Sequence, residues 1–157
     1  MKSVDQLLAE FKQIPKENVP IKLSEYAMSA VKSCLEYTNN PETAAMALGV
    51  LVCSVFLADD KISEQEFQLL YMSAKLSMGD EIDLDSCKEI AKELLATKND
   101  LKTAAVEVAT KYLSLWTDKD KEDLIMYLVG LCAVDNDIAA KEIGWLKLLV
   151  TAAGAYK

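Results

Sequence analysis

Residues 44–58 read AAMALGVLVCSVFLA, and residues 124–134 read LIMYLVGLCAV. Both runs are apolar at nearly every position, which is typical of a helix that is buried on all sides. Elsewhere in the chain apolar residues recur at spacings of three and four, and the alternation typical of strands is missing. The first run is shorter than the roughly 18 residues that a membrane span needs. The sequence therefore predicts an all-α fold with these two helices at its centre.

The positions of proline, glycine and capping residues divide the chain into eight helical segments. We expect them at residues 3–13, 23–39, 41–58, 63–77, 84–96, 101–116, 119–134 and 139–153. Short connections between the segments favour antiparallel neighbours in a compact bundle of about seven to eight helices. The 157 residues suit one domain over 1–157, in which residues 1–20 form an N-terminal helix and linker.

The charged residues exclude several classes of function. The chain has 25 acidic and 17 basic residues, a net charge of -8 and no His, and every basic residue is Lys. Without His there is no Ser-His-Asp triad and no imidazole metal ligand, and without Arg there is no bidentate phosphate clamp. A nucleophile elbow and a glycine-rich phosphate loop are also missing. We therefore expect no enzyme, and the acidity argues against nucleic acid and anionic membranes as partners.

The cysteines and the N-terminus bear on location. No two of the four cysteines have C-x-x-C spacing, so they are expected to be small core residues in a reducing compartment; they are Cys34, Cys53, Cys87 and Cys132. Residues 1–13 mix charged and apolar side chains and lack the apolar core of a signal peptide. These features predict a cytoplasmic protein without direct membrane insertion.

The chain also matches itself at an offset of 76 residues. Residues 57–67, LADDKISEQEF, align with residues 133–143, AVDNDIAAKEI. The identical pairs are Asp59/Asp135, Ile62/Ile138 and Glu66/Glu142. Each half therefore contains a buried helix, a short acidic turn and a second helix with Glu in its first turn. We predict two related helical hairpins, residues 41–78 and 119–155, packed about a pseudo-two-fold axis at the centre.

One interpretation of the repeated acids is purely structural. Ser63 and Glu66 have the spacing of a capping box, and Asp137 is placed to cap the second helix. Acidic residues in a first turn also stabilise a helix through its dipole, by about 0.3 to 1 kcal/mol each. In the second copy, however, Ala139 replaces the capping Ser while Glu142 is retained.

The other interpretation is a metal site made of carboxylates. If the pseudo-two-fold axis brings the two turns together, the acids converge and need a counter-charge. The candidate ligands are Asp59, Glu66, Asp135 and Glu142, with Asp137 as a further candidate. Carboxylate oxygens favour Ca²⁺, Mg²⁺ or Mn²⁺. The spacing is not that of an EF-hand, because Glu comes at loop position eight rather than twelve.

At these residues the chain resembles the tellurite-resistance TerB-like family. The family pattern is an apolar helix that ends in Ala-x-Asp-Gly-x-Ile/Val-x-x-x-Glu, present twice. The chain departs from it at the Gly position, which holds Asp60 and Asn136, two residue types that tolerate a left-handed turn. The resemblance covers about residues 23–155. It implies a compact all-α bacterial domain that acts in stress response and binds metal through its repeated acids.

The resemblance also implies partners, namely other proteins of a stress-response or membrane-associated complex. The functional hypothesis is thus a non-catalytic TerB-like domain that binds a divalent cation through its two hairpins. The alternative is a protein-interaction adaptor in which the acids only cap helices. Such an adaptor is expected to use an exposed face near Tyr112, Leu115 and Trp116, or near Trp145 and Tyr156.

Overall fold

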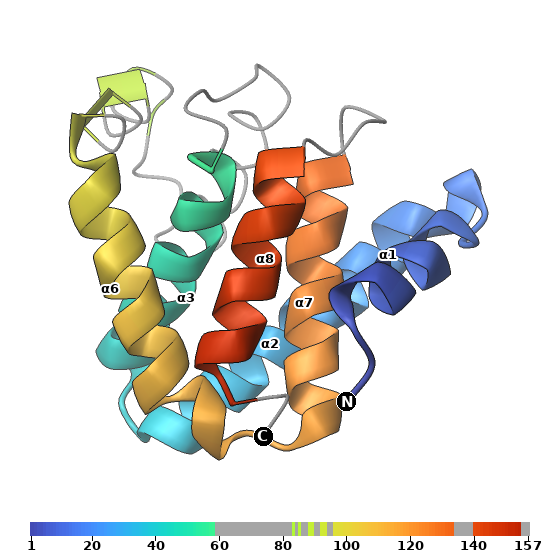
Figure 1. The fold of residues 1–157 in the computed structure, drawn as a ribbon, viewed down its shortest axis with the longest axis horizontal. Helices are drawn as coiled ribbons and strands as arrows, with labels where there is room; N and C mark the ends of the chain where they lie inside the picture. Colours follow the sequence, from blue (N-terminus) through green and yellow to red (C-terminus); the bar gives the residue numbers. More distant parts are fainter. Residues whose placement is uncertain are drawn as a thin grey trace.

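The computed structural model of the chain describes residues 1–58, 83, 85, 88–89, 92–93, 96–133 and 140–154. Every regular element in these ranges is a helix, which confirms the all-α prediction (Figure 1). The α-helices are α1 (Val4–Lys12), α2 (Val19–Thr38), α3 (Pro41–Phe56), α6 (Lys98–Lys111), α7 (Asp118–Cys132) and α8 (Ala140–Ala152). There are also two 3₁₀ turns: η1 (Lys16–Asn18) lies between α1 and α2, and η2 (Leu113–Leu115) lies between α6 and α7. The helix expected at 63–77 and most of the one at 84–96 lie outside the described residues.

The start of α2 differs from the prediction. The sequence interpretation treated residues 1–20 as helix and linker and began the next helix near Leu23, but α2 begins at Val19 and includes Pro20 in its first turn. A proline is tolerated there because the first-turn amides have no partner within the helix. The chain after α1 is therefore a short 3₁₀ turn rather than a longer linker.

Two asparagines form the corner between α2 and α3. Asn39 ends α2 in the left-handed conformation, with φ of 52°. The side chain of Asn40 then caps α3 by accepting hydrogen bonds from the backbone N–H groups of Glu42 and Thr43, at 3.0 and 3.1 Å. Pro41 follows at the first position of α3, where it fits without loss of a hydrogen bond. The predicted break before Pro41 is thus confirmed.

Helix α7 lies at the centre of the described bundle. It contacts α1, α2, α3 and α8, and α3, α6, α7 and α8 stand side by side while α2 crosses behind them (Figure 1). All nine residues from 124 to 132 are buried. The prediction of a helix buried on every side is confirmed for α7. Among the described residues, no helix is both long and apolar enough to cross a membrane.

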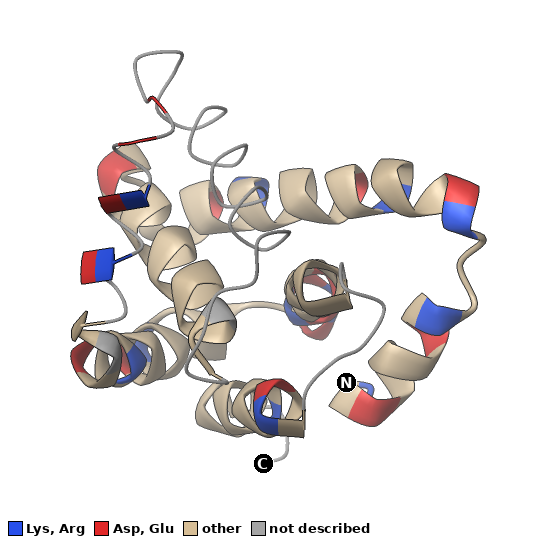
Figure 2. Ribbon diagram, turned by 90° about the horizontal axis from the view of Figure 1, so that it is seen from above, with Lys and Arg blue, Asp and Glu red and all other residues tan. Residues whose placement is uncertain are grey.

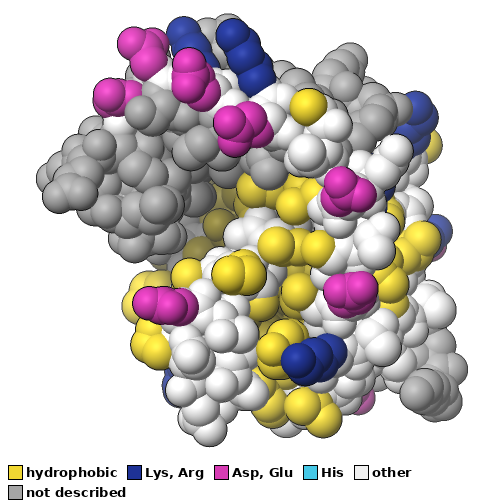
Figure 3. All heavy atoms as spheres, turned by 90° about the vertical axis from the view of Figure 1, so that its left-hand side faces the viewer, with side chains coloured by type: hydrophobic (Ala, Val, Ile, Leu, Met, Phe, Trp, Pro, Cys, Tyr) yellow, Lys and Arg dark blue, Asp and Glu magenta, His cyan; other side chains and the backbone are white. Residues whose placement is uncertain are grey.

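Helix α3 is less enclosed than its composition predicts. Leu51 and Val55 are fully buried, but Met46 is 70% exposed and Gly49 is also exposed. Figure 3 views the side of the molecule on which α3 and α6 lie, and hydrophobic side chains gather in the middle of this face. The prediction that α3 is buried all round is therefore wrong for one of its sides. An apolar composition alone does not tell which sides of a helix are covered.

The burial of Cys34 leads to a prediction about alkaline pH. Cys34 carries a free thiol and is 3% exposed, and burial raises its pKa from about 9 to about 11. The folded state therefore keeps the proton that the unfolded chain releases above about pH 9. Stability from this group is fully present below about pH 9 and is lost as the pH rises through about 11, by up to about 1.4 kcal/mol per pH unit.

Urea denaturation of the wild type and of Cys34→Ala at about pH 8, 9.5 and 10.5 checks this expectation. The two proteins share every other group that titrates at alkaline pH. The difference between their free energies of unfolding therefore isolates the contribution of Cys34. We expect the wild type to lose stability faster than Cys34→Ala above pH 9. Parallel losses in the two proteins would contradict the assignment.

Candidate functional site

The candidate site is the end of the bundle where α3 and α7 finish and α8 begins (the upper end in Figure 1). Helix α3 ends at Phe56 and α7 ends at Cys132, which is the 76-residue spacing of the sequence repeat. The residues after the two helix ends have nearly the same backbone: Leu57 has φ −88° and ψ 0°, and Ala133 has φ −80° and ψ 0°. The repeat therefore includes equivalent helix ends.

Glu142 lies at this end, in the first turn of α8, and is only 4% exposed. It is the one acidic residue that is buried in the described part of the chain. Burying a carboxylate is unfavourable unless opposite charge or hydrogen-bond donors compensate. The positive end of the helix dipole supplies part of that compensation. Glu142 thus differs from the other described acids, which lie in contact with solvent.

A hydrogen bond joins α8 to α3 one turn below Glu142. The indole Nε1 of Trp145 donates to Ser54 Oγ at 2.9 Å, and Ser54 Oγ donates to the carbonyl of Leu51 at 2.8 Å. Ser54 is fully buried, and Lys102 of α6 lies 5.7 Å from the centre of the Trp145 ring. These contacts fix α3, α6 and α8 relative to one another close to the candidate site.

Sequence reasoning missed the role of Ser54 and assigned Trp145 to a possible docking face. The available signal was a single serine inside the otherwise apolar run of α3, since a buried hydroxyl needs a partner. Nothing in the sequence pairs it with a tryptophan 91 positions away.

Of the predicted metal ligands, the structure places only Glu142. Asp59, Glu66, Asp135 and Asp137 lie outside the described residues, as does the predicted capping Ser63. Within the described ranges, no group of three or more Cys, Asp and Glu is arranged to hold a metal ion. The predicted convergence of the two acidic turns remains a prediction.

Of the aromatic residues assigned to an adaptor face, the three that the structure describes are buried or half-buried, namely Tyr112, Trp116 and Trp145, and Tyr156 lies outside the described residues. Trp116 is 5% exposed and stacks on Tyr37, with ring centres 5.6 Å apart and planes inclined by 22°. Tyr112 is half-buried next to Lys111, whose Nζ lies 5.1 Å from the centre of its ring. Leu115 alone of that predicted group is well exposed, at 64%. Trp116 is therefore a core residue.

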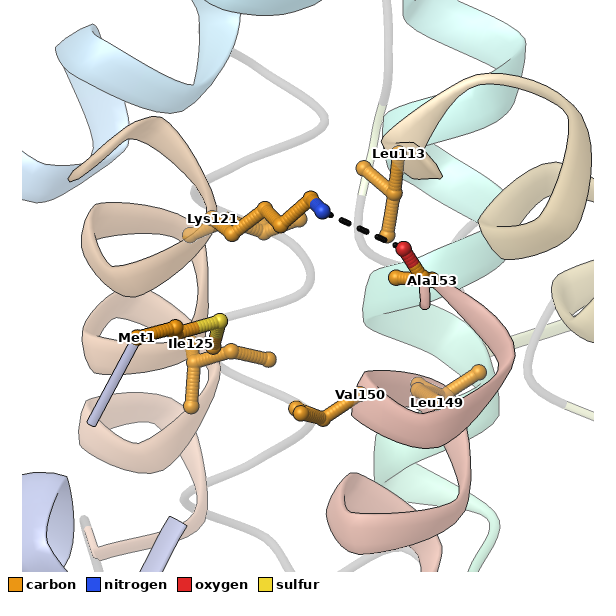
Figure 4. Close-up of a pocket in the computed structure, with 8 residues that line it drawn as sticks. Met1, Leu113, Lys121, Ile125, Leu149, Val150 and Ala153 are labelled. Carbon is orange, nitrogen blue, oxygen red and sulfur yellow. Dashed lines mark hydrogen bonds between the residues drawn. The ribbon is translucent and has the colours of Figure 1, made fainter. Parts of the chain in front are cut away.

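A small apolar pocket lies at the opposite end of α8 (Figure 4). Its lining residues are Met1, Leu113, Lys121, Leu124, Ile125, Leu149, Val150 and Ala153. The buried Lys121 extends from α7 toward the end of α8, where its Nζ donates to the carbonyl oxygen of Ala153 at 3.2 Å. A cation at a helix C-terminus is favourable for the helix dipole. Helix α8 thus has the buried Glu142 in its first turn, and the buried Lys121 of α7 lies beyond its last turn.

Comparisons with family models, with curated proteins and with solved structures found no match to this chain. Its function is therefore inferred from its own residues, its internal repeat and the geometry of the bundle.

Proposed function

We propose that the chain is a non-catalytic TerB-like stress-response domain that binds a divalent cation, Ca²⁺, Mg²⁺ or Mn²⁺. The ligands are the repeated carboxylates at the end of the bundle where α3 and α7 finish and α8 begins. The observation that carries the proposal is the burial of Glu142 at this end. Its partners are then other proteins of a cytoplasmic stress-response or membrane-associated complex.

The course of the chain supports a meeting of the two acidic turns. Helices α3 and α7 end at the same end of the bundle, where α8 begins (Figure 1). Asp59 is bonded directly to Ala58, and Asp135 comes two residues after Ala133. Two carboxylates about 4 Å apart repel by about 4 kcal/mol at an effective dielectric constant of 20. A bound cation removes that repulsion, and pseudo-symmetric hairpins supply ligands from both halves.

The composition restricts the kind of metal. With no His in the chain, the ligands available at the repeated positions are carboxylate oxygens. Hard, oxygen-preferring cations suit such a set better than Zn²⁺ or Cu²⁺ do. We therefore expect the site to prefer Ca²⁺, Mg²⁺ or Mn²⁺.

Thermal denaturation with millimolar CaCl2, MgCl2 or MnCl2 tests the proposal. A cation that binds only the folded state stabilises it by RT ln(1 + [L]/Kd), which is about 2.7 kcal/mol at 100 times Kd. We expect at least one of the three salts to raise Tm relative to an equal ionic strength of NaCl. We expect Glu142→Gln, which keeps the shape but removes the charge, to abolish that rise.

Glu42→Gln is the matched control, because Glu42 also lies in the first turn of a helix but is exposed. It should leave the cation response intact. The proposal fails if no cation shifts Tm, or if Glu142→Gln responds to the cation as the wild type does.

An adaptor whose acids only cap helices is the second candidate, and the position of Glu142 in the first turn of α8 favours it. In that case Glu142→Gln lowers Tm by the same amount with and without the cation, because only the helix dipole interaction is lost. The same melting experiment thus separates the two functions.

A further inference from the structure

The outer side of α2 carries an apolar stripe that the bundle does not cover. Its members are Ile21 (62% exposed), Met28 (71%), Val31 (45%) and Leu35 (41%). At 100° per residue they fall within an arc of roughly 80°, and their spacing is that of the a and d positions of a heptad. The opposite side of α2, with Ala30 and Cys34 buried, already packs on α7 and α3. The stripe is thus a second apolar face of the same helix.

Charged residues of alternating sign run beside this stripe. Along the chain they are Lys22, Glu25, Lys32 and Glu36, and all four are exposed. On the helix they lie on one side of the apolar stripe, within a further arc of roughly 80°. Figure 2 shows the alternation of basic and acidic residues along α2. Within one chain Lys22 Nζ lies 3.4 Å from a carboxylate oxygen of Glu25.

The order of these charges matches opposite charges when a second α2 runs in the opposite direction. Read from the N-terminus the signs are plus, minus, plus, minus, so an antiparallel copy sets Lys22 against Glu36 and Glu25 against Lys32. A parallel copy instead sets each charge level with its own counterpart of the same sign. The pair of Glu25 and Lys32 is centred between Met28 and Ser29, and the pair of Lys22 and Glu36 is centred on Ser29. A two-fold axis that passes between the two α2 helices at this level, perpendicular to both, sets opposite charges against each other at all four positions and places the stripe against itself.

We propose that the outer face of α2 binds a second copy of this chain, with the two α2 helices antiparallel about a two-fold axis near Met28. The apolar stripe forms the seam of the interface, and the alternating charges set its direction and register. This self-association does not depend on the proposed cation site, which lies at the end of the bundle where α8 begins.

The interface is expected to be weak. Helix α2 has 20 residues and is therefore about 30 Å long. One helix pair of this length lies near the lower limit of specific interfaces, about 1,200 Å² in total. We therefore expect a dissociation constant in the micromolar range, with the chain monomeric at low concentration and dimeric at high concentration.

Sedimentation velocity of the full chain from about 5 to 500 µM, a range that spans micromolar dissociation constants, measures the association. We expect a concentration-dependent dimer in the wild type. Met28→Glu places two carboxylates next to the axis and should weaken the dimer by about tenfold or more. Met46→Glu is the matched control, because Met46 of α3 is equally exposed, at 70%, and lies outside the stripe; it should dimerise like the wild type.

Charge reversal tests the antiparallel direction. Glu25→Lys and Lys32→Glu each create two like-charged pairs in their own antiparallel dimer, so each alone should associate more weakly than the wild type. An equimolar mixture of the two restores opposite charges at both positions and should recover the dimer. Circular dichroism and Tm identify any variant that has not folded. Because the substituted positions are exposed, we expect all variants to fold, so a change in association reports on the interface.

Three results would overturn the proposal. They are a wild type that stays monomeric at the highest concentration, equal effects of Met28→Glu and Met46→Glu, and single charge reversals that associate as well as the wild type. The last result would indicate a parallel pair, in which reversal leaves like charges level with one another.

Discussion

Replacing Leu128 by Ala is expected to lower the free energy of unfolding by about 2–5 kcal/mol, the range measured for fully buried leucines. Leu128 is fully buried in the middle of α7, the helix that contacts α1, α2, α3 and α8. Helices on several sides hold the site open, so the cavity left by the missing atoms cannot readily collapse. Urea denaturation monitored by circular dichroism measures the loss as a lower midpoint.

Leu148→Ala is the control for this prediction. Leu148 lies in α8 and is 46% exposed, so the same atoms are removed from a site that already meets water. The change should stay within about 0.5 kcal/mol, as for most surface substitutions. Comparable losses for the two variants would show that α7 is not the centre of the core.

The second large effect is expected at Gly130 of α7, which lies against side chains of α1 and α2. A Cβ atom added there would collide with Cδ1 of Leu23 and lie 3.2 Å from Cε2 of Phe11. Gly130→Leu adds a whole side chain where even a Cβ does not fit, so Leu23 and Phe11 must move, and overpacking of this kind costs about 1–3 kcal/mol. The expected result is a lower Tm and a lower urea midpoint.

Gly49→Leu separates packing from helix propensity. An added Cβ at Gly49 meets nothing within 4 Å. Leucine is a better helix former than glycine by about 0.8 kcal/mol, so this variant should be as stable as the wild type or slightly more stable. If Gly49→Leu and Gly130→Leu change stability in the same direction, the close approach at Gly130 does not control the packing.

The sequence alone predicts the helices well where local chemistry controls them. The break at Asn39, Asn40 and Pro41 is readable because an αL residue, a side-chain cap and a first-turn proline are all local devices. The start of α2 at Val19 was harder to predict, because a proline is compatible both with a linker and with the first turn of a helix.

The candidate site is less predictable, since it depends on contacts between distant residues. The repeat identifies Glu142, and the burial of this side chain sets it apart from the exposed acids. Neither the burial of Glu142 nor the bond between Trp145 and Ser54 follows from periodicity, because both depend on how segments distant in the sequence pack together. The exposure of Met28 and Met46 has the same origin: an apolar residue type does not reveal whether another helix covers it.

The bond between Trp145 and Ser54 makes the chain its own optical reporter. The sequence has two tryptophans, and Trp116 is buried in a stack on Tyr37. In a Trp116→Phe variant all indole emission comes from Trp145, whose ring is half-buried between α3 and α6. Any event that lifts α8 from α3 exposes this indole to water and shifts its emission to longer wavelength. Fluorescence can therefore follow the packing of α8 against α3 in real time, without an attached dye.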